Sequence, residues 1–485
     1  EINGAPPIKP ADEGGLVAEM GGRVHTADSD KIERHFISCE QLEDCVEARW
    51  QWVFDEEIAN FLYRFKIVGK SLEVELEGGN GKACGLTLGR VMDAVSPKLI
   101  TIPYFNFGDH HPRLLSTAGT LISSFVDWNY TNATSVYSVD REKAERETRL
   151  NGGCSYTKNT KGVRVPLQDR WVLTVSTSFD EAFPRIEFPA APQTEAPVWA
   201  TYPWYSLSTL EPSEESYVEI YETLRILKQL GIEKLLVNHP AETWHDGEGA
   251  SEFSTDAAPI KGGDDALGEY IEALDELGFQ ASLQTGFRHI ATTDPEYTPN
   301  NTALTEDSQP AVTGSGTHLF KPTLAAGQCE KHMAQHVDKF RPAIPYITSH
   351  AALPPWDFTD CDYATDLLPT LPNGLELQRN LLSTIGKHSS CIGDGGNHWL
   401  YAGLLQAVRA KMVGENPSKL PVLVDFDLFN LHSLHVNVGL GSPEDYFGNT
   451  IPQEEKNSRS SFFLRYIATT AAFGHAASLP DANEW

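Results

Sequence analysis

Apolar and polar side chains alternate with a period of two through roughly the first 185 residues of the chain. Phe61, Tyr63 and Phe65 occupy every second position of one run, and Leu72 and Leu76 belong to another run in which glutamates fill the positions between. Such alternation between turns rich in Gly, Asn and Asp predicts half-buried antiparallel strands. Several runs of this kind without a convincing helix predict a β-sandwich.

A proline-rich segment follows these strands. It contains four closely spaced prolines, Pro184, Pro189, Pro192 and Pro197. Proline cannot donate a hydrogen bond to a sheet or continue a helix, so the segment predicts a linker. We therefore expect a β-sandwich domain over residues 1–188, a linker over 189–197 and a second domain over 198–485.

The hydrophobic pattern changes after residue 198, where short apolar runs alternate with segments that have helical periodicity. Glycines at 231 and 278 follow two of the predicted helices, as expected at helix ends. The predicted strands lie at residues 198–203, 234–237, 279–283, 344–347, 391–393 and 421–424. A helix is predicted on Tyr401, Leu404, Leu405, Val408 and Met412, and a last one over residues 458–470.

Alternating strands and helices predict a parallel sheet, and the long polar loops after the strands favour a (β/α)₈ TIM-type barrel. The rival is a doubly wound sheet, but neither GxGxxG after a strand nor GxxxxGK[ST] occurs. About seven units can be counted, against the eight of such a barrel. Either the chain is truncated or the missing unit lies within residues 433–451.

Composition narrows the class of protein. Acidic residues outnumber basic ones by 67 to 38, a net charge of −29, which excludes broad nucleic-acid binding. No apolar run is long enough for a membrane span. The chain begins at Glu1, as a processed product would, so we expect a secreted or periplasmic protein. The oligomeric state stays open.

The residues that follow the predicted strands share one chemistry. They are mostly Trp, His, Arg and Asn, which suit the apolar faces and hydroxyls of a carbohydrate. Function in a barrel sits at these strand ends. The predicted substrate-binding residues are Trp204, Asn238, His239, Trp244, Arg288, His289, His350, Trp356, His398 and Trp399.

Three aspartates are the candidate catalytic residues. Asp394 directly follows an apolar strand, and Gly395-Gly396 would let the backbone turn and expose its carboxyl. Burial by a nearby Trp399 would raise its pKa and favour a general-acid role. Glycosidic hydrolysis requires a second carboxyl, for which Asp357 and Asp427 are candidates.

The histidines at the strand ends also suggest a metal site. They lie on different loops and form neither HExxH nor HxH, and the seven cysteines form no CxxC pair. We therefore expect them to bind the ligand by hydrogen bonds, and we expect no metal and no cofactor.

Several longer sequence segments resemble those of a known protein family. They are DRWVLTVSTSFDEAFP at 169–184, LRILKQLGIEKLLVNHPAETWHDG at 224–247, IGDGGNHWLYAGLLQA at 392–407 and FGHAA at 473–477. Over roughly residues 160–480 the chain resembles bacterial glycoside hydrolases of the endo-α-N-acetylgalactosaminidase group.

The resemblance implies a sandwich followed by a retaining barrel. It also implies an aspartate nucleophile at the end of strand four and a glutamate acid/base just after strand five. Asp394 stands at the strand-five position, whereas Thr348-Ser349-His350 at strand four contains no carboxylate. The second carboxylate must then come from elsewhere, which is compatible with inversion or with a changed or lost activity.

These observations predict a glycoside hydrolase that cleaves a complex polysaccharide. An acidic or sulfated sugar is one option, because Arg288 and the histidines would supply positive groups. A non-catalytic carbohydrate-binding protein on a barrel scaffold is the alternative, and a metal-dependent hydrolase or lyase is the third candidate.

Overall fold

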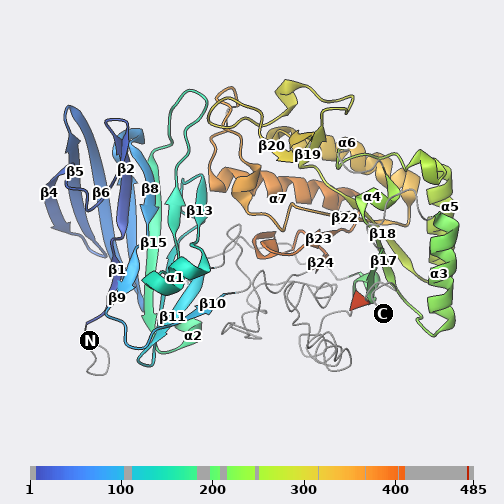
Figure 1. The fold of residues 1–485 in the computed structure, drawn as a ribbon, viewed down its shortest axis with the longest axis horizontal. Coiled ribbons are helices and arrows are strands. Elements are labelled where there is room, and N and C mark those ends of the chain that lie inside the picture. The colour runs from blue at the N-terminus through green and yellow to red at the C-terminus, as the bar shows by residue number, and fades with distance from the viewer. Residues whose placement is uncertain are drawn as a thin grey trace.

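The computed structural model describes most of the chain and divides it into an antiparallel part and a parallel part (Figure 1). The described residues are 7–102, 112–182, 197–207, 216–245, 251–314, 316–365, 367–401, 403–409 and 478–479. Within these ranges, no helix combines the length and apolar character needed to cross a membrane.

The antiparallel part is the sandwich expected from the period-two pattern. Its larger sheet has the order β10-β11-β12-β15-β7-β6-β5-β4, and its smaller sheet the order β13-β14-β8-β2-β3. The larger sheet consists of β4 (Glu33–Gln41), β5 (Val46–Phe54), β6 (Glu57–Val68), β7 (Ser71–Gly78), β10 (Lys98–Thr101), β11 (Arg113–Thr117), β12 (Thr120–Val126) and β15 (Leu167–Ser176). The smaller sheet consists of β2 (Gly15–Met20), β3 (Arg23–Thr26), β8 (Ala83–Thr87), β13 (Ser135–Tyr137) and β14 (Gly153–Ser155), and β1 (Lys9–Asp12) pairs with β9 (Arg90–Met92).

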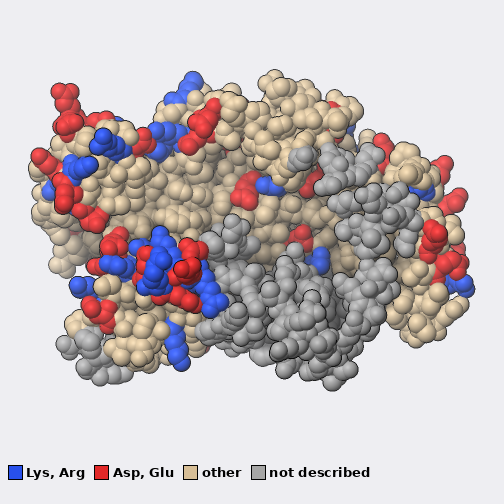
Figure 2. Space-filling model, viewed as in Figure 1, with Lys and Arg blue, Asp and Glu red and all other residues tan. Residues whose placement is uncertain are grey.

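Two short helices accompany the sandwich, α1 (Arg141–Glu147) and α2 (Phe179–Ala182). Acidic and basic side chains mix over α1 on the face drawn in Figure 2, where Arg141 and Glu145 form an ion pair one helical turn apart. The net charge of −29 therefore does not appear as a uniformly acidic surface on this face.

The parallel part is one sheet with the order β24-β23-β22-β18-β17-β16-β25. Its strands are β16 (Trp204–Ser206), β17 (Leu236–His239), β18 (Gln280–Thr285), β22 (Ile344–Ile347), β23 (Ile392–Asp394), β24 (Ala407–Arg409) and β25 (Ser478–Leu479). The last strand pairs in parallel with the first, on the side opposite β17. The predicted parallel α/β architecture is thus present.

Helices follow the strands in the expected alternation. They are α3 (Tyr217–Gln229), α4 (Ala241–Trp244), α5 (Gly263–Leu277), α6 (Pro322–Phe340) and α7 (Leu371–His388), with 3-10 turns η2 (Val198–Thr201), η5 (Pro355–Phe358) and η6 (His398–Tyr401). Ser216 and Glu219 form a reciprocal capping box at the start of α3. A small antiparallel sheet, β19 (His289–Ala291), β21 (Thr317–Leu319) and β20 (Val312–Gly314), follows β18.

Two predicted elements are wrong. Residues 198–201 form the turn η2, and the first strand begins only at Trp204. The helix predicted across 401–412 contains strand β24, which pairs with β23 through Gly393 and Val408. A short run buried on both faces gives the same apolar signal in a strand as in a helix. The predicted strand 421–424 and helix 458–470 lie outside the described residues.

Backbone hydrogen bonds join the sandwich to the parallel part. The amide of Leu371, the first residue of α7, donates to the carbonyl of Ala133 at 2.8 Å. The amide of Thr160 donates to the carbonyl of Cys361 at 2.9 Å. The predicted linker at 189–197 lies almost entirely outside the described residues, so the domain limits stay predictions.

Candidate functional site

Side chains of the parallel sheet alternate between two differently packed faces. On one face Trp204, Leu236, Tyr346, Ile392 and Ala407 form a cluster of their own. On the other face the strands pack against α3 and α5. Because side chains alternate along a strand, the residues two positions beyond the cluster members share their face. On β16, β17, β23 and β24 those residues are Ser206, Asn238, Asp394 and Arg409, which lie at the carboxyl ends of their strands.

Asp394 is held at the end of β23 by neighbouring strands. Its carboxylate accepts a hydrogen bond from the hydroxyl of Tyr346 on β22, and Arg409 of β24 lies beside it in register. Burial, together with the neighbouring carboxylate, raises the pKa of Tyr346 well above its usual value, so the hydroxyl is a donor. Gly396 has φ 147°, and a Cβ there would meet the carbonyl oxygen of Ala352 at 2.6 Å. The sharp turn predicted after Asp394 therefore does require glycine.

Glu252 lies over the turn that follows β18. Its carbonyl accepts hydrogen bonds from Thr285 Oγ1 at 3.0 Å and from the amide of Gly286 at 3.1 Å. Its carboxyl Oε2 accepts one from the amide of Arg288, also at 3.1 Å. Burial raises the pKa of Glu252 to about 7, and the charge of Asp394 acts in the same direction, against the lowering effect of Arg288. Two carboxyl groups thus interact electrostatically at this end of the sheet.

Arg288, His289 and Asp357 complete this group. Arg288 donates to Nε2 of His289 at 2.9 Å, which requires that nitrogen to be unprotonated. Burial, helped by the adjacent guanidinium, lowers the pKa of His289 to about 4. The 3.5 Å approach of His289 to Glu252 is therefore not an ion pair. Burial also lowers the pKa of Arg288, while Asp357 and Glu252 oppose that shift.

Two predicted substrate-binding histidines are interior residues whose ring nitrogens are both engaged. His239 faces α5, where Nε2 bonds to the Tyr270 hydroxyl at 2.9 Å and Nδ1 to the Ser282 carbonyl at 3.1 Å. His350 accepts from the amide of Phe287 at 2.9 Å and bonds to Gln378 at 2.6 Å. Neither ring has a nitrogen left for a ligand, so the structure gives both a packing role.

Two predicted tryptophans are also core residues. Trp204 is 1% exposed and packs edge-on against Tyr346, with ring centroids 5.4 Å apart. Trp244 is fully buried, and its Nε1 donates to the carbonyl of Gln284 at 2.9 Å. Both are large apolar side chains that fill the interior, which removes them from the surface a sugar would meet.

The remaining predicted site residues lie in different parts of the fold. Asn238 shares the interior face and donates to Ser206 Oγ at 3.1 Å. Trp356 lies half-buried in η5, and His398 accepts from the amide of Gly396 at 3.1 Å. Asp427 and the side chain of Trp399 lie outside what the structure describes. The structure therefore brings together Asp394, Arg288, His289 and Asp357 among the sequence candidates.

Glu252 is the residue that the sequence did not reveal. It lies well beyond the end of β17, several residues past the polar segment 238–246 that directly follows this strand. No spacing links it to the turn after β18, so only the fold shows the contact. Within the described ranges, no group of three or more His, Cys, Asp and Glu residues is arranged to hold a metal ion.

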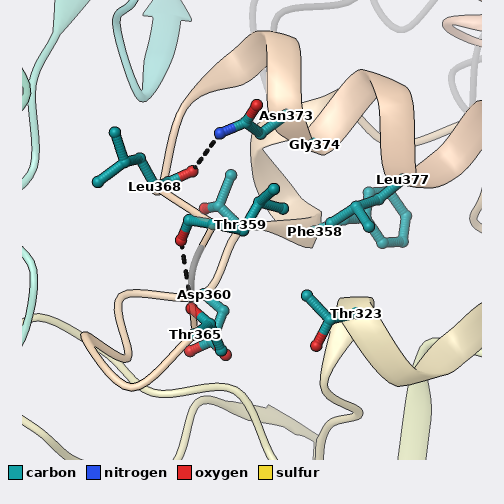
Figure 3. Close-up of a pocket in the computed structure, with 10 residues that line it drawn as sticks. Thr323, Phe358, Thr359, Asp360, Thr365, Leu368, Asn373, Gly374 and Leu377 are labelled. Atoms are coloured by element: carbon teal, nitrogen blue, oxygen red, sulfur yellow. Dashed lines mark hydrogen bonds between the residues drawn. The ribbon is translucent and has the colours of Figure 1, made fainter.

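Two cavities lie away from this group. One has about 10 Å³, room for roughly one water molecule, and lies between η5 and the start of α7 (Figure 3). Its lining includes Phe358, whose ring also stacks on His350 at 5.2 Å. The other, of about 310 Å³, lies at the amino ends of β18 and β22, opposite Asp394. Neither is a place for a sugar at the carboxyl ends of the strands.

The contact between Gly286 and Glu252 can be tested by stability. A Cβ on Gly286 would meet Oε2 of Glu252 at 2.5 Å and its Cδ at 2.9 Å. Gly286→Ala should therefore lower the free energy of unfolding by about 1–3 kcal/mol, measured by urea denaturation. Because the carboxyl of Glu252 supplies the two closest atoms, most of this loss should disappear in the Glu252→Ala background, where only the Cβ contact at 3.3 Å remains.

The matched control is Gly327→Ala on α6, where a Cβ meets nothing within 4 Å. It should be neutral or stabilising by up to about 1 kcal/mol, as alanine is in a helix. An equal loss for Gly286→Ala with and without Glu252 would mean that the carboxyl does not lie over the turn.

Known structures share this fold, although no protein-family model and no curated protein matches the chain. The α-N-acetylgalactosaminidase NagBb from Bifidobacterium bifidum in complex with GalNAc aligns with a TM-score of 0.59 at 12% identity, over 84% of this chain and 75% of that one. Its ligand-free structure aligns with the same TM-score at 11% identity, over 84% and 76%. The predicted resemblance to glycoside hydrolases of this kind is confirmed for the fold.

Proposed function

We propose that this protein is a glycoside hydrolase in which Glu252 and Asp394 are the two catalytic carboxyl groups. The observation that carries the proposal is that the two carboxyl groups lie in different environments at the carboxyl ends of the strands. The pKa of Glu252 is raised to about 7 by burial and by Asp394, whereas Asp394 accepts a hydrogen bond from Tyr346. Pairs of carboxyl groups in different environments are the basis of glycosidic acid/base catalysis.

The environments suggest a role for each group. Below about pH 7 Glu252 carries a proton that it can donate to the leaving glycosidic oxygen. Asp394, whose carboxyl group is oriented by the hydroxyl of Tyr346, suits the partner that acts as nucleophile or as base toward water. The general-acid role that the sequence predicted for Asp394 is thus proposed for Glu252. Asp357 acts on Arg288 instead of on the scissile bond.

The wider architecture is part of the same proposal. The return of β25 beside β16 supports a (β/α)₈ barrel, because a barrel closes where its last strand pairs with its first. We place the catalytic unit in residues 198–485, after a sandwich at 1–188 and a linker at 189–197. A secreted or periplasmic location is kept as a proposal.

The charges at the site favour an uncharged sugar over an acidic or sulfated one. Arg288 is accompanied by Asp357, and Arg409 lies beside Asp394. His289 and His350 are neutral, since the pKa of each is lowered to about 4. The positive groups that favoured an anionic substrate are therefore either paired with a carboxylate, as Arg288 is, or uncharged, as the histidines are. An anionic ligand would add charge beside the two carboxyls.

Hydrolysis of a panel of methyl glycosides, whose leaving group needs a proton from a general acid, tests the function by the release of reducing sugar. The panel includes the α-N-acetylgalactosaminide, named for the structural neighbour, and sulfated counterparts. We expect release from an uncharged glycoside, with kcat falling as pH rises above about 7 because Glu252 loses its proton. Sulfated counterparts should react at least about tenfold more slowly.

Three outcomes would contradict this proposal. Binding of glycans on an array with no released product would indicate the carbohydrate-binding alternative. Activity that disappears with a chelator and returns with a metal ion would indicate the metal-dependent one. A rate that keeps rising through pH 9 would reject Glu252 as the acid.

A further inference from the structure

A buried hydrogen-bonded relay connects α7 to the turn beneath Glu252. Gln378 on α7 and His350 after β22 are each 1% exposed. Oε1 of Gln378 lies 2.6 Å from Nδ1 of His350, and Nε2 of His350 lies 2.9 Å from the amide nitrogen of Phe287. Neither Gln378 nor Phe287 was a candidate for any role from sequence.

The chemistry of these partners fixes the protonation of the imidazole. A backbone amide only donates, so Nε2 of His350 accepts and its proton must lie on Nδ1. That proton is donated to the carbonyl oxygen of the Gln378 amide. Gln378 thereby holds His350 in the one tautomer that can accept from Phe287.

Phe287 is the centre of the turn that supports Glu252. The residue before it, Gly286, donates its amide to the Glu252 carbonyl, and the residue after it, Arg288, donates its amide to the Glu252 carboxyl. A turn held at its central amide keeps both flanking donors in place. Loss of that hydrogen bond would free the turn and leave the Phe287 amide buried without a partner.

We propose that Gln378 is a positioning residue, which fixes the catalytic turn through His350 and so holds the partly buried Glu252 carboxyl in its place over that turn. The expected effect of Gln378 on catalysis rests on the proposed function. The relay itself requires only the contacts above.

Within the described residues, the charged and titratable groups around Glu252 come from the turn after β18, from β19 and from β23. They are Arg288 and His289 on the turn and β19, and Asp394 on β23, while Asp357 of η5 acts on Arg288. His350 faces Gln378, Arg288 and His289. Gln378 itself is uncharged, so an effect of its replacement on Glu252 must pass through geometry.

The test compares Gln378→Leu, which removes the acceptor, with Gln378→Glu, which keeps one. The readout is the pH dependence of carbodiimide labelling of Glu252, followed by peptide mass spectrometry, because the reagent requires the protonated carboxyl. Wild type should show a midpoint near 7. Gln378→Leu should lower it by about one unit as more water reaches the carboxyl, whereas Gln378→Glu, which keeps an acceptor for His350, should not lower it. Gln335→Leu on α6 is the control.

Amide hydrogen exchange gives a second readout that needs no variant to be fully stable. In wild type the Phe287 amide should exchange slowly, and Gln378→Leu should accelerate it at least about tenfold relative to core amides of β18. Fast exchange of Phe287 in wild type would overturn the proposal, even if Gln378→Leu does not fold.

Activity separates this inference from the proposed function. If glycosides are hydrolysed, Gln378→Leu should lower kcat by about 10- to 100-fold with little change in KM. An unchanged labelling midpoint in Gln378→Leu rejects the positioning role whatever the activity. A shifted midpoint in a protein that hydrolyses no glycoside rejects the proposed function and leaves the relay standing.

Discussion

Replacement of Asp394 by asparagine is expected to lower kcat by about 10²- to 10⁴-fold, the usual contribution of a positioned catalytic carboxyl. Asparagine has nearly the same shape, and its carbonyl oxygen can still accept from the Tyr346 hydroxyl. The strand-end packing should therefore persist, and KM should change little. Steady-state kinetics on the glycoside found by the panel would measure the loss, and thermal melting would check the fold.

The control for this substitution is Asp338→Asn, an exposed aspartate on α6. It should keep full activity. Glu252→Gln should also lower kcat, and it should remove the decline above pH 7 that we assign to Glu252. Retention of more than about a tenth of the wild-type kcat by Asp394→Asn would reject its catalytic role.

Asp394 was within reach of sequence reasoning because its environment is local. An apolar strand, an aspartate and two glycines are adjacent in the chain, and the structure places the carboxyl at the strand end as expected. Glu252 was out of reach because its partners, Gly286 and Arg288, belong to a different turn. Its raised pKa depends on burial, which no local pattern encodes.

Strand parity explains why the two polar residues at the end of β17 lie apart in the structure. The sequence prediction assigned every polar residue at the end of β17 to the ligand. Asn238 and His239 are consecutive, so only one of them can share the face of Leu236. The structure gives that face to Asn238 and turns His239 toward Tyr270. Because consecutive strand residues point to opposite faces, the alternation alone excludes one of the two from a shared ligand site.

The sandwich was the most predictable part of the fold, because its strands are long and clearly alternating. β6 and β7 follow the predicted runs, and Phe61 and Leu76 lie in the core. The parallel strands are short and buried, so the ends of β17, β18 and β23 differ from the prediction by one or two residues, although β22 matches it. β24 falls within a predicted helix, since Leu405 and Val408 are both buried in the core and fit a helical period as well as a strand.

Acidification should destabilise this protein between about pH 6.5 and 4, because several histidines are buried in the neutral form. Burial lowers the pKa of His239, His336 and His350 to about 4. The folded state then binds fewer protons than the unfolded chain between pH 4 and 6.5, and stability falls as pH drops through that window. Each histidine accounts for about 3 kcal/mol of this loss. Glu252 and Asp169, whose pKa values are raised to about 7 and about 6, act in the opposite direction and offset part of it.

His336→Phe is the substitution that should reveal this effect most directly. The ring lies edge-on to Trp244 and Phe340, at 5.8 and 5.6 Å, and its Nε2 is buried without a hydrogen-bond partner in the described part of the chain. Phenylalanine fits this apolar surrounding and cannot gain a proton. Urea denaturation at pH 5 should show a stability gain of at least about 1 kcal/mol over wild type, and the gain should shrink toward pH 8. The exposed His35→Phe should change neither value, and an acid-unfolding midpoint identical in His336→Phe and wild type would mean that His336 already titrates normally in the folded protein.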